Sequence, residues 1–318
     1  MKNAIFLPLF AVVALVGACS SKSGGTVDGA PHIAGFDPPG PAEGQVQIFS
    51  PVVHAVPAGA DYTHCSYIAN PFGDREVDVV KAEGFESKWG HHALLMAVKN
   101  GYKAGDSHEC GDADMNDARF LAGATDAAAN VKIPDGIGFR IAPGGVMLVQ
   151  THWINTSASV IEGQASFNVT LKPHDGSRQN AQLFASFTSE LVLPPRGPAH
   201  AVSECVIQEP LQFFDLGGHA HEWGRNVKVE KITAAGETSS LYDEPWLPEY
   251  TSNPPQRHYE LSSPLTFAKG DTVRVTCDWQ NTTNEEIGFP REMCVVFGMI
   301  FPADADIHCQ DGAWSVLR

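Results

Sequence analysis

Two histidines, His219 and His221, stand two positions apart in the stretch GGHAHEWGR. On a β-strand successive side chains point to opposite faces, so residues at i and i+2 share one face. Histidine is the commonest metal ligand in proteins, and two imidazoles on one face can bind the same ion. The spacing therefore indicates a metal site, although from spacing alone a structural role for the pair stays open.

Three more of the thirteen histidines lie on apolar, strand-like runs. His91 and His92 are adjacent in WGHHALLM, and His152 stands in LVQTHWIN. Neighbours in a regular strand point to opposite faces, so joint binding by His91 and His92 requires a bend or different ring nitrogens. A single strand histidine is more often a hydrogen-bonded core or surface residue than a ligand, and this alternative stays open for each of the three.

The elements that must position these residues are predicted to be strands. Short β-branched or alternating runs recur between Gly, Pro, Asn and Asp clusters, for example REVDVVKAEGF, GGVMLVQTHWIN, ASFNVTLKP and DTVRVTCDW. There is no long helical period, and the alanine-rich segment 112–130 is predicted to be an irregular loop with a turn or two. The pattern favours an all-β fold of two consecutive antiparallel, jelly-roll-like β-sandwich domains. We place these domains at residues 45–176 and 177–318.

The N-terminal stretch MKNAIFLPLFAVVALVGAC has the charge, apolar run and small residues of a signal peptide, assigned here to residues 1–18. Its end, LVGAC, resembles the bacterial lipobox, which implies cleavage before Cys19 and lipidation of that cysteine. The alternative is an ordinary signal peptide with an incidental cysteine. Residues 19–44 are rich in Gly, Ser and Pro and are predicted to form a flexible tether.

These features predict a lipoprotein exported to the bacterial cell envelope, which contacts the membrane only through Cys19. Ser20, directly after Cys19, favours the outer membrane and periplasm by analogy.

The chain of 318 residues is 43% hydrophobic and carries a formal charge of −16. That charge argues against nucleic acid as a partner, because a phosphate backbone must be met by clustered Lys and Arg.

Six cysteines remain if Cys19 carries lipid, and an oxidising compartment favours disulfides between them. Six cysteines allow fifteen pairings. A bridge between Cys277 and Cys294 is the easiest to infer, because it closes a short loop between two strand-like runs.

Several motifs together resemble one enzyme family. The segment VTCDWQNTTNEEIGFPREMCVVFGMIFP (275–302), the HH pair, GIGFRIAPGGVMLVQTHW and GGHAHEWG occur in the order found in copper type II, ascorbate-dependent monooxygenases. This is the family of the peptidylglycine α-hydroxylating and dopamine β-hydroxylating enzymes. The likeness runs from about Tyr62 to Cys309.

The resemblance implies two copper sites, on different sandwiches that face a solvent-filled cleft. The ligands of the electron-transfer copper would be His91, His92 and His152, and those of the oxygen-binding copper would be His219, His221 and Met293. Imidazole suits copper, and a soft thioether favours Cu(I). Gln150 matches a family glutamine near the cleft, and an ordinary polar strand residue is the alternative there. The family's disulfides map onto Cys65–Cys110, Cys205–Cys309 and Cys277–Cys294.

The activity implied is hydroxylation of an unactivated C–H bond, with O2 and with ascorbate or another reductant. Relatives that amidate peptides bind the substrate carboxylate with an arginine, where this chain has Gly217. Val295 and Phe297 replace an asparagine and a tyrosine, so we expect a small, hydrophobic substrate. Two alternatives are a non-catalytic copper-binding or storage lipoprotein, and a structural β-sandwich lipoprotein with coincidental histidines.

Overall fold

The structure is a computed structural model that describes residues 25–26, 32–98, 101–111, 113–114, 118–124, 129–131 and 133–317. The signal peptide predicted at residues 1–18 and the lipidation predicted at Cys19 lie outside these residues. Strands dominate the described chain, so the protein is all-β, as the sequence predicts. Among the described residues, no helix is long and apolar enough to cross a membrane.

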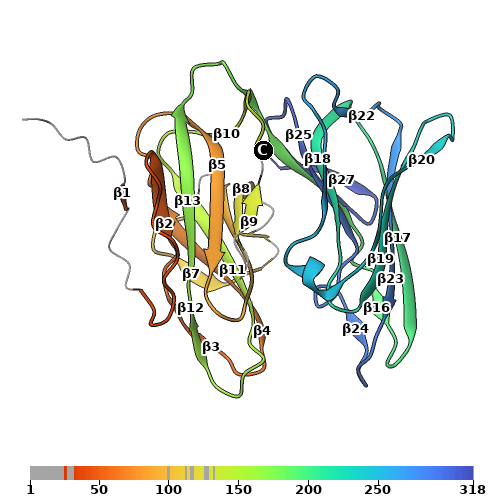
Figure 1. Cartoon of the computed structure of the whole chain (residues 1–318), viewed down its shortest axis with the longest axis horizontal. Helices are drawn as coiled ribbons and strands as arrows, with labels where there is room; N and C mark the ends of the chain where they lie inside the picture. Colours follow the sequence, from red (N-terminus) through yellow and green to blue (C-terminus); the bar gives the residue numbers. More distant parts are fainter. Residues whose placement is uncertain are drawn as a thin grey trace, which may run out of the picture.

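Two sheets form a sandwich from the first part of the chain, here called the N-terminal sandwich (Figure 1). One sheet contains β1 (Gly25–Thr26), β2 (Gln45–Phe49), β13 (Ala165–Pro173), β5 (Val77–Glu86), β10 (Ile137–Ile141) and β14 (Gln179–Asn180) in that spatial order, with β9 (Ala129–Val131) paired to β5. The other has the order β7 (Ser107–Glu109), β4 (Asp61–Ala69), β11 (Val146–Ile154), β6 (Gly90–Val98) and β8 (Ala118–Ala124). A ribbon of β3 (Val53–Val56) and β12 (Ile161–Gly163) accompanies them.

The rest of the chain forms a second pair of sheets, here called the C-terminal sandwich. One sheet has the order β21 (Gln256–His258), β18 (Leu211–His219), β25 (Val295–Ile300), β15 (Gln182–Phe187), β26 (Asp306–Gln310) and β27 (Ala313–Leu317), with β22 (Leu265–Phe267) paired to β18. The other has the order β17 (Pro198–Val206), β23 (Thr272–Gln280), β19 (Gly224–Ile232) and β20 (Thr238–Pro245). The ribbon β16 (Val192–Leu193) and β24 (Ile287–Gly288) and the 3-10 helix η1 (Pro248–Thr251) complete the described elements.

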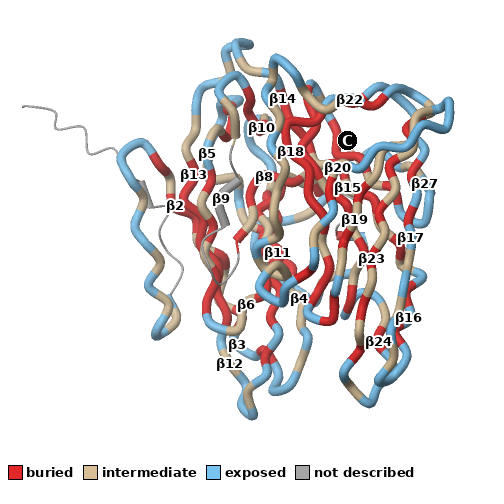
Figure 2. The backbone as a smooth tube through the Cα atoms, turned by 45° about the vertical axis from the view of Figure 1, so that its right-hand side comes forward, coloured by how far each residue is buried: buried red, intermediate tan, exposed pale blue. Residues whose placement is uncertain are grey.

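Alternation of burial along the strands explains why these segments form sheets. In β23, Val273, Val275, Cys277 and Trp279 are buried, while the residues between them are half-buried. This period of two places one face of the strand in the core. Figure 2 shows the buried backbone following the strands of both sandwiches, with exposed residues in the loops that connect them.

Strand pairing is antiparallel for most described strands, but β1–β2, β10–β14 and β15–β26 pair in parallel. The predicted antiparallel β-sandwiches therefore contain three parallel pairs as well. Two of the parallel pairs involve strands of only two residues at a sheet edge, where a short flanking segment adds to the sheet in either direction.

The segment 112–130 was predicted to be an irregular loop, but its described residues include β8 and β9. Small residues pack closely here: a Cβ added at Gly84 would lie 2.5 Å from Ala124 Cβ. The small alanine side chains therefore allow the two sheets to approach closely. This explains why β8 has few of the β-branched residues that usually mark a strand.

Residues 32–44, predicted to belong to a flexible tether, lie against the N-terminal sandwich. The carbonyl of Pro39 accepts hydrogen bonds from Gln47 Nε2 and Asn168 Nδ2, each at 2.9 Å. Gln164 Oε1 accepts the backbone N–H of Ile33 at 3.3 Å. Side chains of β2 and β13 and the residue before β13 thus hold this part of the segment in place.

The two sandwiches share a buried interface. Phe214, Met299 and Phe301 of the C-terminal sandwich belong to the same core cluster as Phe120 of the N-terminal one. The buried carboxylate of Asp306 accepts backbone N–H groups from both sides, from Phe120 at 2.9 Å and from Leu183 at 2.8 Å. Apolar packing and these hydrogen bonds together fix the relative position of the sandwiches.

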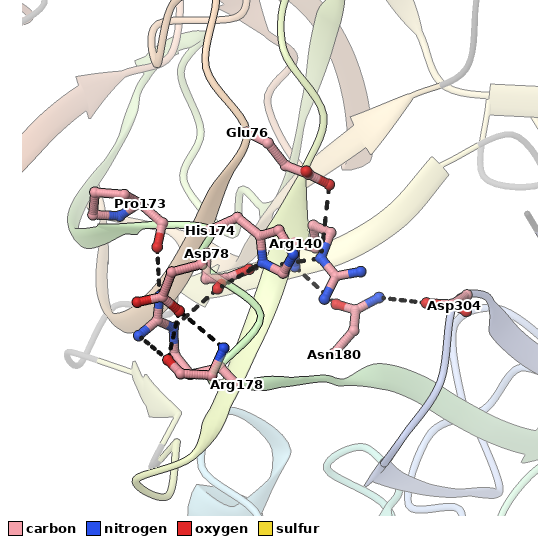
Figure 3. A network of polar contacts seen from close by, with 10 residues as sticks. Glu76, Asp78, Arg140, Pro173, His174, Arg178, Asn180 and Asp304 are labelled. Carbon is pink, nitrogen blue, oxygen red and sulfur yellow. Dashed lines mark hydrogen bonds and ion pairs between the residues drawn. The ribbon is translucent and has the colours of Figure 1, made fainter.

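The segment that crosses between the sandwiches is held by a polar network around Asp78 (Figure 3). The Asp78 carboxylate, 1% exposed, receives Arg178 Nε at 2.9 Å and lies 3.2 Å from His174 Nδ1. Farther along, Asn180 Nδ2 donates to Asp304 Oδ1 of the C-terminal sandwich at 3.4 Å. The crossing segment is therefore anchored at both ends.

Candidate metal centre

A β-bulge brings His91 and His92 to one site. His152 of β11 pairs with His92 of β6, but the next residue, Trp153, pairs with Gly90, which leaves His91 as the extra residue. A bulge bends the strand and re-aims the inserted side chain. The bend that adjacent ligands require is therefore present at His91.

The three N-terminal histidines lie close enough to hold one ion. One ring nitrogen from each of His91, His92 and His152 lies within 4.8 Å of the other two. The ring centroids are 4.9 to 5.1 Å apart, and His91 and His152 are buried. The structure thus brings together the histidines that we predicted for the electron-transfer copper.

The H-x-H pair lies at the end of β18. His219 is the last residue of that strand, and His221 follows the buried Ala220. The two rings have centroids 5.0 Å apart, so both side chains reach the same region. Their proximity is that expected of residues at i and i+2 of an extended chain.

The two groups of histidines also meet each other. The His91 and His221 rings, one from each sandwich, have centroids 5.0 Å apart in an edge-to-face arrangement, and both residues are only 5% exposed. The resemblance implied sites separated by a solvent-filled cleft, and at these residues the structure differs. The two sandwiches are in contact at His91 and His221, as they are in the core cluster that includes Met299 and Phe301.

Met293 is positioned through Glu292, which is fully buried. Glu292 Oε1 accepts the backbone N–H of His221 at 2.5 Å and that of Met293 at 2.9 Å. The disulfide between Cys277 and Cys294 fixes the next residue to β23. The backbone of Met293 is thus tied to that of His221 by one carboxylate oxygen and to the core sheet by one covalent bond.

Burial keeps the imidazoles neutral. Removal from water disfavours the charged ring, which lowers the pKa of His91, His92 and His219 well below the usual 6.5 and that of His221 to about 4. Neighbouring imidazoles lower these pKa values further. Neutral imidazole is the form that binds metals, so the cluster is ready to act as a set of ligands at neutral pH.

Hydrogen bonds decide which ring nitrogen is free. His221 Nδ1 lies 2.9 Å from the carbonyl of Arg291, which can only accept, so Nδ1 carries the proton and Nε2 keeps its lone pair. His152 Nε2 lies 2.5 Å from Asp61 Oδ1, and this bond lowers the pKa of the Asp61 carboxyl. Asp61 is therefore an ionised acceptor, which leaves Nδ1 of His152 free.

Buried ring nitrogens without partners point to an absent ligand. Nε2 of His91 and Nε2 of His221 are buried and form no hydrogen bond with the described residues. Buried polar atoms are normally paired, so two unpaired nitrogens in one cluster require an explanation. Five imidazoles, with the backbone of Met293 held next to that of His221, are donors of the type that copper binds.

Gln150 lies next to this cluster. It is on β11, two residues before His152, and it is 7% exposed. Its side chain hydrogen-bonds to His92. Gln150 is therefore a neighbour of a candidate ligand.

Two residues with a part in the site were not predicted. Asp61 contacts His152 across 91 positions of sequence, and no local motif marks it. Glu292 lies in the segment 275–302 that carries the family resemblance, but it was given no role of its own. Its position directly before Met293 was the available signal.

Three disulfides are present, and they join the cysteines that the resemblance pairs. They are Cys65–Cys110, Cys205–Cys309 and Cys277–Cys294. Disulfides of this number are typical of exported proteins, because cytosolic thiols are kept reduced.

A comparison with known protein families finds a match within the C-terminal sandwich. Residues 181–314 match the family model for the copper type II ascorbate-dependent monooxygenase, C-terminal domain. This match supports that family and covers His219, His221 and Met293. No curated protein matches the chain.

Among solved structures, the major capsid protein P2 from bacteriophage PM2 aligns over 80% of this chain and 98% of its own, at 9% identity and a TM-score of 0.32. A likeness at that level bears on neither fold nor function.

Proposed function

We propose that the protein is a copper-dependent monooxygenase that hydroxylates an unactivated C–H bond of a small, hydrophobic substrate. It would use O2 and an ascorbate-like reductant. One observation carries the proposal: five histidines from two sandwiches form a single cluster that contains unpaired, buried ring nitrogens. The family match of residues 181–314 supports the same conclusion.

Two sets of side chains would hold two copper ions. The first set is His91, His92 and His152, and the second is His219, His221 and Met293. When bound, copper supplies the one-electron chemistry that allows O2 to oxidise a C–H bond. The thioether of Met293 is a soft donor that favours Cu(I) in the second set, whereas the first set has only imidazoles.

The protein's own contribution is to hold the ligands in place. Asp61 and the Arg291 carbonyl fix the tautomers of His152 and His221, and Glu292 fixes the backbone that carries His221 and Met293. Such partners of metal ligands orient the rings and raise their affinity for the metal. The 5.0 Å approach of the His91 and His221 rings gives the two sets a short path between them.

We also propose that the protein acts in the bacterial cell envelope, held by a lipid on Cys19. The lipobox-like sequence LVGAC and the three disulfides support this location. The substrate and O2 would then reach the protein outside the cytoplasm.

Copper titration followed by oxygen measurement tests the function. The purified chain is loaded with Cu(II), freed of excess metal and supplied with ascorbate and a panel of apolar substrates, while O2 uptake and hydroxylated product are recorded. We expect two copper ions per chain and product formation that requires both copper and reductant. The same protein loaded with zinc is the control. Tight copper binding without reductant-dependent uptake would instead favour the storage function.

A further inference from the structure

The outer face of the sheet that carries β18 and β25 lies directly beside the predicted oxygen site. Cross-strand partners share a face, and His219 pairs with Val295, which pairs with Phe187. The next row along the sheet contains Gly217, Phe297 and Ala185. The opposite face is the core side, where a Cβ at Gly218 would lie 2.4 Å from Val227.

Gly217 leaves this face without a side chain, and Gln256 occupies the space. Gln256 of β21 is the cross-strand partner of Gly217. A Cβ added at Gly217 would lie 2.6 Å from Gln256 Nε2, 2.7 Å from Oε1 and 2.8 Å from Cδ. The amide of Gln256 therefore lies flat over Gly217, two residues from His219 on the same face.

The Gln256 amide has unused hydrogen-bonding capacity. Its Nε2 donates to the carbonyl of Pro254 at 3.2 Å. Its Oε1 is buried and accepts no hydrogen bond from any described residue. Since a buried acceptor without a donor is unfavourable, a ligand that donated a hydrogen bond here would be stabilised.

Toward His219 the surroundings of Gln256 are apolar, whereas the adjacent row on its other side holds Asp215 and His258, whose side chains lie 2.6 Å apart. Val295, Phe297 and Phe187 are half-buried on this face, and Phe187 stacks on Phe289 at 5.9 Å. In the Gly217 row Ala185 pairs with His308, and burial lowers the pKa of the His308 imidazole to about 4, so this ring is neutral at pH 7.

The nearest cation in sequence, Arg257, pairs with Leu216 rather than Gly217, so it belongs to the opposite face of the sheet. There its guanidinium forms an ion pair with Glu244 and lies 5.0 Å from the Tyr242 ring centroid. Arg257 is thus not available to bind a carboxylate next to His219.

We propose that Gln256 is the specificity-determining residue of the site, and that it selects an uncharged, mainly apolar substrate with one hydrogen-bond donor. The donor binds Gln256 Oε1, and the apolar part packs on Phe297 and Val295. A carboxylate is disfavoured at Gln256, because it would meet the amide carbonyl oxygen and lie near Asp215, with which His258 is already paired. The inference rests on the proposed function for the role of His219, but it concerns binding and not turnover.

Three probes of one shape test the proposal: phenylacetamide, which is neutral and has an N–H donor; phenylacetone, which is neutral and has none; and phenylacetate, which is charged. Dissociation constants are measured by calorimetry on the copper-free protein, so that the carboxylate of phenylacetate has no metal to bind. We expect the wild type to bind the amide about tenfold more tightly than the ketone, which corresponds to one net hydrogen bond. Phenylacetate should bind most weakly.

Two variants locate the effect. Gln256→Leu should remove the preference for the amide and leave the affinity for the ketone unchanged. Gly217→Ala should do the same, because its Cβ displaces Gln256 without altering the amide. Gln212→Leu, an exposed position on the same strand, is the matched control and should behave as the wild type. Circular dichroism verifies that each variant is folded.

The proposal is overturned if no probe binds the wild type, if phenylacetate binds as well as the amide, or if the amide preference survives in Gln256→Leu. A different result is expected if only the proposed monooxygenase function is wrong. Ascorbate-dependent O2 uptake would be absent, while the amide preference and its loss in Gln256→Leu would persist.

Discussion

The backbone N–H groups of His221 and Met293 donate to the same atom, Glu292 Oε1, at 2.5 and 2.9 Å. The two residues lie on different segments of the C-terminal sandwich, and both are candidate ligands of one ion. A single buried carboxylate thus determines how far apart their backbones can move.

Replacing Glu292 tests this link. Glu292→Ala leaves two N–H groups without their acceptor, which should lower the free energy of unfolding by about 2–4 kcal/mol. Glu292→Gln keeps a carbonyl oxygen that can accept both bonds, so most of the stability should remain. Urea unfolding of the copper-free proteins measures the difference. Equal losses in the two variants would show that the shared acceptor is not what stabilises this region.

Met293→Ile removes the thioether at nearly constant volume. We expect one copper per chain instead of two, bound by the three N-terminal histidines, and loss of hydroxylation, because no soft donor remains for Cu(I). Copper analysis and O2 uptake measure both effects. Met96→Ile, a buried methionine in a satellite core cluster of the N-terminal sandwich, is the control and should retain both copper ions. Normal turnover by Met293→Ile would refute the assignment of the oxygen site.

Asp61→Asn should lower the copper affinity of the site formed by His91, His92 and His152. The ionised carboxylate holds His152 in the tautomer with a free Nδ1, and an amide provides a weaker acceptor at that position. Loss of such a partner typically lowers metal affinity about 10- to 100-fold. Competition with a copper chelator gives the affinity, and the exposed Asp135→Asn is the matched control. An unchanged affinity at the three-histidine site would exclude this role for Asp61.

The interface between the sandwiches should respond to pH through Asp306. Burial raises the pKa of this carboxyl from the usual 3.8 to about 6, because the charged form is disfavoured. Its contribution to stability is therefore greatest below pH 4 and is lost as the pH rises through 6, by about 2–3 kcal/mol.

Asp306→Asn imitates the protonated form and should remove this pH dependence. From pH 4 to pH 7 the wild type should therefore lose stability relative to the variant, whose unfolding free energy no longer depends on this group. Chemical denaturation at several pH values, with copper-free protein, records it. A constant difference over that range would mean that Asp306 does not titrate with folding.

Much of the sheet structure could be predicted from local pattern. The run GGVMLVQTHWIN contains β11, and DTVRVTCDW covers all but the last residue of β23, because β-branched and alternating residues are typical of half-buried strands. Prediction failed for β8, because its alanines and glycine lack the β-branched, alternating pattern. These small residues instead allow the two sheets to pack closely.

The candidate site was predictable in composition and only partly in arrangement. The H-x-H spacing placed His219 and His221 together, since an extended chain repeats every two residues. For His91 and His92 the sequence showed that a bend was needed, but the bulge follows from pairing with β11, more than 50 residues later.

The amino-acid sequence by itself determined the all-β class, the faces of the strands and the residue types available to bind a metal, because these depend on neighbours within a few positions. Only the tertiary structure decided that His91 meets His221, that Asp61 reaches His152 and that Gln256 covers Gly217. These contacts depend on strand register and on how the two sandwiches pack. Both arise from many weak interactions between residues far apart in the chain, and no local periodicity encodes them.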